Sequence, residues 1–138
     1  MSDSNNNIHY GGCLCGAVRY TLNGALRPIS NCHCKQCRQW SGHYVSATRP
    51  AEGIDINDPQ GMLKWYQSSP TAKRGFCGQC GSSLFWDGGG SPSVMAGTMD
   101  DTGTLTARQH IFTADKGAYY NIEDDLPKYP QSSPPDTR

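Results

Sequence analysis

The chain has 138 residues, 36% of them hydrophobic, and a formal net charge of zero, which predicts one small domain with a lean core. No run of eighteen apolar residues is present, which excludes a predicted transmembrane helix, and the neutral charge argues against nucleic-acid binding, which usually needs a basic face. The N-terminus is polar and lacks an apolar signal region, so we expect a cytoplasmic protein without membrane or nucleic-acid partners.

Taken in chain order, residues 1–7 are predicted to be disordered, residues 8–129 to form the domain, and residues 130–138 to form a flexible tail. Alternating or β-forming residues between Gly and Pro turns predict short strands at 17–22, 43–48, 62–66, 72–76, 83–86, 94–98 and 109–113. One or two helical turns are predicted at Lys35–Ser41, ended by Gly42 in a left-handed conformation. The pattern predicts a mainly β fold of short strands with one or two short helical turns.

Seven cysteines carry most of the functional information, and they lie at Cys13, Cys15, Cys32, Cys34, Cys37, Cys77 and Cys80. Two thiolates close together in sequence can both reach one soft divalent ion at ~2.3 Å. Cytoplasmic cysteines stay reduced, and an odd number cannot complete a disulfide framework, so metal binding is favoured. Division into four and three is the natural one: four thiolates complete a tetrahedral zinc site, whereas three leave a position open, as at a catalytic zinc.

Two of the cysteine pairs lie in glycine-containing turns. Cys77 and Cys80 form a C-x-x-C step followed by glycine, which is typical of a zinc knuckle. A thioredoxin-type redox pair is the alternative, but it requires a long helix after the second cysteine, and residues 81–86 begin none. Cys13 and Cys15 stand between Gly12 and Gly16, which allow the backbone to turn both sulfurs toward one ion. The alternative for this pair is two buried core cysteines.

The stretch from Cys32 to Cys37 contains three cysteines and a histidine. If a helix begins near Cys34, Cys34 and Cys37 lie on one face, and Cys32 provides the third corner of a site. His33 is expected to point away from the ion as a surface or packing residue, with a fourth ligand or a base as the alternatives. The other histidines have no context that marks them as ligands, although one lies in an aromatic-flanked segment; they are His9, His43 and His110.

Three cysteine blocks in this order resemble the glutathione-dependent formaldehyde-activating enzyme family, which shares its domain with the centromere protein V group. The blocks are Gly11-Gly-Cys-Leu-Cys-Gly-Ala-Val-Arg-Tyr20, Cys32-His-Cys-Lys-Gln-Cys-Arg38 with Ser41-Gly42, and Arg74-Gly-Phe-Cys-Gly-Gln-Cys-Gly81 with Leu84-Phe85. The resemblance runs from about Ile8 to Tyr129 and includes Gly97-Thr-Met-Asp-Asp101 and Asp124-Asp-Leu-Pro-Lys-Tyr129.

The resemblance implies a zinc-stabilised Mss4-like fold with two zinc ions per chain. Cys13, Cys15, Cys77 and Cys80 would hold the structural zinc, and Cys32, Cys34 and Cys37 the catalytic zinc. The implied activity is a carbon–sulfur lyase reaction in which formaldehyde and glutathione form S-(hydroxymethyl)glutathione. The expected partners are therefore a small-molecule thiol such as glutathione and an aldehyde, and a homo-oligomer is compatible with the sequence.

The chemistry of an open three-thiolate zinc agrees with this reaction class, because such an ion can lower the pKa of an incoming thiol. The cations nearest the cysteines in sequence are expected to be solvated surface residues rather than substrate contacts; they are Lys35, Arg38, Lys73 and Arg74. Two other classes of protein remain as alternatives. One is a noncatalytic zinc-stabilised binding domain, and the other is a thiol redox protein.

Overall fold

The structure is a computed structural model that describes residues 7–134. Apart from Asn7, the predicted disordered segment lies outside the described residues, and so do residues 135–138 of the predicted tail. The described part contains ten strands, one α-helix and short 3-10 turns. The prediction of a mainly β fold of short strands with a short helix is confirmed.

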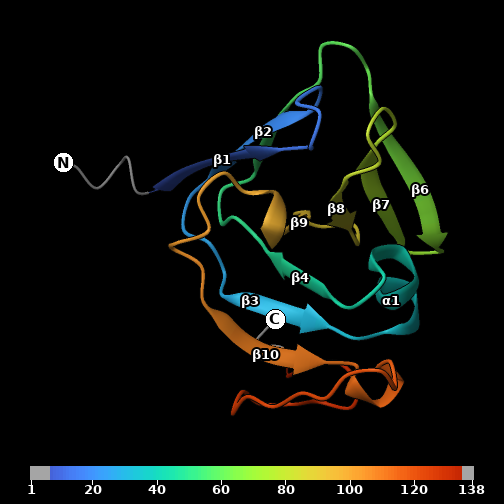
Figure 1. Cartoon of the computed structure of the whole chain (residues 1–138). Coiled ribbons are helices and arrows are strands. Elements are labelled where there is room, and N and C mark those ends of the chain that lie inside the picture. The colour runs from blue at the N-terminus through green and yellow to red at the C-terminus, as the bar shows by residue number, and fades with distance from the viewer. Residues whose placement is uncertain (1–6, 135–138) are drawn as a thin grey trace.

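The strands form two sheets (Figure 1). The small antiparallel sheet has the order β1-β2-β5, with β1 at Ile8–Gly12, β2 at Arg19–Asn23 and β5 at Ile54–Asn57. The large sheet has the order β10-β3-β4-β9-β8-β7-β6. Its strands are β3 (Ile29–Cys32), β4 (Val45–Thr48), β6 (Leu63–Ser69), β7 (Ala72–Cys77), β8 (Ser83–Asp87), β9 (Ser93–Met95) and β10 (Ala107–Ile111). Its neighbouring strands are antiparallel except β10 and β3, which are parallel.

The main core lies between the two sheets. Tyr20 and Leu22 alternate inward along β2, while Leu84 and Phe85 on β8 and Val94 on β9 contribute from the large sheet. The rings of Tyr20 and Phe85 meet edge to face with centroids 5.6 Å apart. Burial of these apolar side chains holds the small sheet against the large one.

The helix α1 (Lys35–Ser41) has the predicted bounds because both ends carry local signals. Cys34 is its N-cap, and the Cys34 sulfur accepts a hydrogen bond from the Cys37 backbone N–H at 3.3 Å. Gly42 ends the helix with φ 83°, a conformation that glycine adopts without steric penalty. In Figure 1, α1 follows the end of β3 and lies near the end of β6, and Gln36 donates to the Ser68 carbonyl at 3.0 Å.

Three strands were not expected from the sequence, namely β1, β3 and β5, because their residues are glycine-containing or polar. The predicted strand at 94–98 was wrong beyond Met95, since residues 96–98 form a 3-10 turn. The Thr98 hydroxyl stabilises this turn by donating to the Met95 carbonyl at 2.8 Å. Downstream of β10, residues 127–131 lie beside that strand, and the backbone N–H of His110 donates to the Pro127 carbonyl at 2.9 Å.

Candidate functional site

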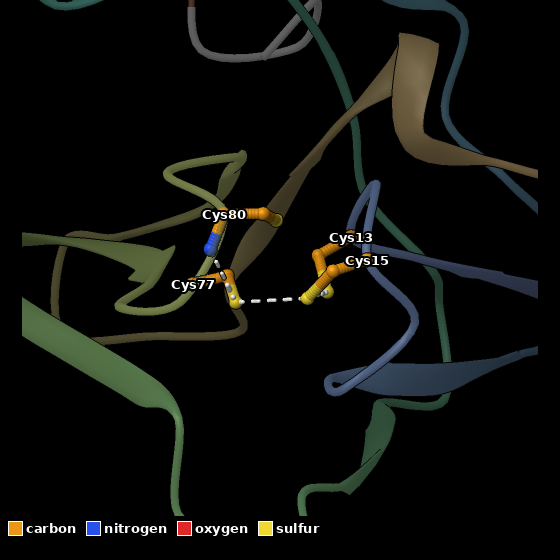
Figure 2. Close-up of side chains that lie close together, drawn as sticks. All are labelled: Cys13, Cys15, Cys77 and Cys80. Atoms are coloured by element: carbon orange, nitrogen blue, oxygen red, sulfur yellow. Dashed lines mark hydrogen bonds between the residues drawn. The ribbon is translucent and has the colours of Figure 1, made fainter.

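Four cysteines from two hairpin turns form the first cluster (Figure 2). Cys13 and Cys15 lie in the turn between β1 and β2, Cys77 ends β7, and Cys80 lies in the turn before β8. The Sγ atoms of Cys13 and Cys15 are 3.6 Å apart, and those of Cys15 and Cys77 are 3.8 Å apart. A tetrahedral ion with Zn–S bonds of ~2.3 Å requires sulfurs ~3.8 Å apart, so this cluster fits zinc.

Hydrogen-bond donors contact these sulfurs and oppose the effect of burial, which raises the pKa of Cys77 to about 11. The Val18 backbone N–H donates to Cys13 at 3.3 Å, and the Cys80 N–H donates to Cys77 at 3.4 Å. The Ser82 hydroxyl lies 3.2 Å from the Cys80 sulfur and, with its backbone, lowers the pKa of Cys80 to about 5. A ligand set of four sulfurs, with donors that support thiolates, suits a soft ion such as zinc.

Three further cysteines form the second cluster, in which the ligand atoms of Cys32, Cys34 and Cys37 lie within 4.8 Å of one another. Cys32 ends β3, Cys34 caps α1, and Cys37 is in the first turn of the helix. Hydrogen bonds from Cys32 and then Cys37 lower the pKa of Cys34, whereas hydrogen bonds with Cys34 and Cys37 raise the pKa of Cys32. Among residues 7–134, no histidine or carboxylate joins this group. The cluster therefore offers an ion three sulfurs, a number that also fits a zinc site with one position left open.

His33 is buried and uses both ring nitrogens away from the cysteines. Its Nδ1 lies 2.6 Å from the Tyr120 hydroxyl, and its Nε2 lies 2.8 Å from Nδ1 of His110. Burial, followed by the charges of neighbouring histidines, lowers the pKa of His33 to about 4, so the ring is neutral at neutral pH. The packing interpretation of His33 agrees with these contacts, which leave neither ring nitrogen for a metal ion.

His110 extends this network to the segment that follows β10. Its Nε2 lies 2.9 Å from the Asp124 carboxylate, and the Tyr44 ring packs on His33 with centroids 4.4 Å apart. Asp124 belongs to a motif already noted in the sequence, but the link between His33 and His110 spans 77 residues and has no local signature. The network fixes the junction between β3 and α1, where Cys32 and Cys34 flank His33.

Replacement Tyr120→Phe tests this anchoring role. We expect it to lower the free energy of unfolding by about 1 kcal/mol, because the buried His33 nitrogen loses its partner. The melting temperature should fall by on the order of 4 °C in a thermal scan. Tyr119→Phe is the matched control, since the Tyr119 hydroxyl makes an exposed hydrogen bond to the Gly42 carbonyl that water can replace. Equal shifts in both variants would contradict the anchoring role.

Arg74 was expected to be a solvated surface residue, but the structure shows that it is buried. Its Nη1 and Nη2 donate to the Cys37 sulfur at 3.6 and 3.7 Å, and the guanidinium lies 5.1 Å from the centroid of the Trp40 ring. The alternation of β7 explains the difference: Arg74 points toward the cysteines, whereas Lys73 lies over Trp65, 4.6 Å from its ring centroid. Arg74 thus places a fixed positive charge on the second cluster.

The second cluster opens into a cavity of about 490 Å³. One face of the large sheet lines it, with side chains from β3, β4, β7, β8, β9 and β10. Its apolar lining includes Val45, Ala47 and Met95, and its polar lining includes Ser30 and Gln109. Cavities of this size accommodate small-molecule ligands. The first cluster contributes no residue to the lining.

Comparison with known proteins identifies the family of this chain. The chain belongs to the glutathione-dependent formaldehyde-activating enzyme family, whose model matches residues 8–115. It is 32% identical over 76 residues to an uncharacterized lyase of Schizosaccharomyces pombe, a match that covers 55% of each protein. The chain thus matches about half the length of this curated relative.

Among solved structures, a Rhodobacter sphaeroides protein shares the fold with a TM-score of 0.53 and 23% identity. The similarity covers 71% of this chain and 98% of that one. Within residues 7–134, no helix has the length and apolar character that crossing a membrane requires.

Proposed function

We propose that this protein is a zinc-dependent enzyme of the carbon–sulfur lyase type that forms and cleaves a thiol–aldehyde adduct. The family name points to glutathione and formaldehyde as the pair. The observation that carries the proposal is the cluster of Cys32, Cys34 and Cys37, which lines a cavity of about 490 Å³. The S. pombe relative, itself named a lyase, supports the same class.

The two clusters suit different roles. The first has four sulfurs, joins the turns of two sheets and lies away from the cavity, which suits a structural ion. The second has three sulfurs beside the cavity, which suits a catalytic ion. When bound there, zinc would supply a Lewis acid that lowers the pKa of an incoming thiol.

The reaction is the addition of a thiol to a carbonyl group. A bond forms between the thiol sulfur and the aldehyde carbon, the electron pair of the C=O π bond moves to oxygen, and the thiol proton ends on that oxygen. Arg74 assists by neutralising part of the negative charge that the cysteines accumulate, since it donates to Cys37 twice. The apolar wall formed by Val45, Ala47 and Met95 limits water beside the reacting sulfur.

Exchange spectroscopy tests the proposal, because thiols add to formaldehyde rapidly without a catalyst. Formaldehyde, glutathione and their adduct are mixed at equilibrium, and the exchange rate is measured without protein, with zinc-loaded protein and with Cys34→Ser. We expect the zinc-loaded protein to accelerate exchange and the variant to return it to the uncatalysed rate. Equal rates in all three samples, with no glutathione binding in direct titration, would exclude this chemistry and favour a noncatalytic binding domain.

A further inference from the structure

Two arginines lie in the cavity beyond the cysteine cluster, and neither was singled out by the sequence. Arg49 directly follows β4 and continues its alternation, so that Val45, Ala47 and Arg49 all line the cavity. Arg27 precedes β3 and is held beside Arg49, because its backbone N–H donates to the Arg49 carbonyl at 3.0 Å. The two chain segments therefore present both guanidinium groups to the same end of the cavity.

These guanidinium groups lack anionic partners in the described structure. Arg27 donates from Nη2 to the Ala47 carbonyl at 3.1 Å, and Arg49 donates from Nη2 to the Ser93 hydroxyl at 3.2 Å. The Nε atoms of both arginines are buried without a hydrogen-bond partner. The ion pairs found among residues 7–134 involve neither arginine, and no described aspartate or glutamate lines the cavity.

The positive charges of Arg27 and Arg49 are unfavourable in the cavity unless a ligand compensates them. Burial, followed by the positive charges of Arg49 and Arg108, lowers the pKa of Arg27 to about 10. Clustered cations that are partly removed from water require a counter-charge, and a guanidinium fork matches a carboxylate through two parallel hydrogen bonds. An anionic ligand would supply this counter-charge, and both arginines line the cavity that could hold one.

The spacing along β4 relates this end of the cavity to the cysteines. Cys32 pairs with Val45, and the Arg27 guanidinium reaches the carbonyl of Ala47, two residues further along the strand. Two residues of a strand span ~7 Å, and the four from Val45 to Arg49 span ~13 Å. These backbone spacings place a carboxylate ~7–13 Å from a thiol at the cysteine cluster, which corresponds to about two to four extended residues.

We propose that Arg27 and Arg49 form a carboxylate-binding subsite that selects thiols carrying an acid group at tripeptide distance from sulfur. This inference rests on the proposed function, because it places the thiol at the second cysteine cluster. Arg27 and Arg49 act in substrate binding, whereas Arg74 acts on the cluster itself. Such a subsite would favour an anionic thiol over a neutral one.

Direct binding tests the subsite separately from turnover. Zinc-loaded protein is titrated calorimetrically with S-methylglutathione, which keeps both carboxylates but has no free thiol, and with its diethyl ester. We expect Arg27→Gln and Arg49→Gln each to weaken binding of the acid by about tenfold to hundredfold. Arg19→Gln is the matched control, since Arg19 pairs with Asp100 outside the cavity and should leave binding unchanged. The diethyl ester should bind the unmodified protein more weakly than the acid does, by a factor similar to that caused by the arginine replacements.

The two proposals fail in different ways. Binding of the acid form that depends on Arg27 and Arg49, without accelerated exchange, supports the subsite and contradicts the lyase. Accelerated exchange that is equally efficient with glutathione and with 2-mercaptoethanol supports the lyase and overturns the subsite. Equal affinity of wild-type protein for the acid and the ester also overturns the subsite, and this comparison needs no variant and thus does not depend on how the variants fold.

Discussion

Cys80→Ser is expected to unfold or aggregate the protein, whereas Cys34→Ser is expected to leave it folded. Cys80 belongs to the cluster that joins the turn between β1 and β2 to the turn between β7 and β8 (Figure 2). Cys15 and Cys77 in that cluster are 62 residues apart in sequence, so an ion shared between them closes a long loop. Cys34 joins only residues that are already neighbours in β3 and α1.

The two variants should differ strongly in stability because zinc binding supplies much of the folding free energy of a small zinc domain. Binding of a structural zinc ion contributes about 10–16 kcal/mol to the folding of small zinc domains, and a domain is stable by only about 5–15 kcal/mol. Loss of one of four ligands should therefore remove most of the stability of this lean core. The second cluster lies on elements that are held by hydrogen bonds and by the His33 network. Loss of the ion from this cluster should therefore lower the free energy of unfolding far less.

Thermal unfolding and elemental analysis measure this contrast together. The unmodified protein should hold two zinc ions per chain and Cys34→Ser one, with a melting temperature close to that of the unmodified protein. Chelator should remove the ion of the three-cysteine cluster first, because that ion has fewer protein ligands. Equal loss of thermal stability in the two variants would show that the division into structural and catalytic clusters is wrong.

The sequence was most informative where local signals decide the structure. The helix α1 has the expected bounds, and Gly42 ends it as expected, because a left-handed glycine acts within a single turn. The cysteines that the spacing marked as candidate ligands gather into two groups. The three unexpected strands are short and polar or contain glycine, and their pairing depends on neighbours distant in sequence.

The cavity itself was not foreseeable from local patterns. Whether an arginine is solvated or buried depends on which face of a strand it occupies and on what packs there. Arg74 and Lys73 are adjacent in sequence and differ in environment for this reason. Arg27 and Arg49 lie outside the cysteine motifs and meet only because β3 and β4 pair. Charge and spacing in the sequence contain no signal that would single them out.

Arg74→Met is expected to lower the zinc affinity of the second cluster and the rate of exchange by about 10- to 100-fold each. Arg74 is 5% exposed and donates two hydrogen bonds to Cys37, so its loss leaves buried negative charge without its counter-charge. Methionine keeps much of the side-chain volume, which limits the change to charge and hydrogen bonding. Competition titration with a fluorescent zinc chelator measures the affinity, and exchange spectroscopy measures the rate.

Two further variants separate the charge of Arg74 from its geometry. Arg74→Lys keeps the positive charge but loses the planar fork that contacts Cys37, Gln36 and Trp40, so it should recover only part of the lost affinity. Lys73→Gln is the matched control, because it removes a cation from the neighbouring position on β7 that lies over Trp65 instead. If Lys73→Gln weakened zinc binding as much as Arg74→Met, the effect would come from net charge, and the contact between Arg74 and Cys37 would have no special role.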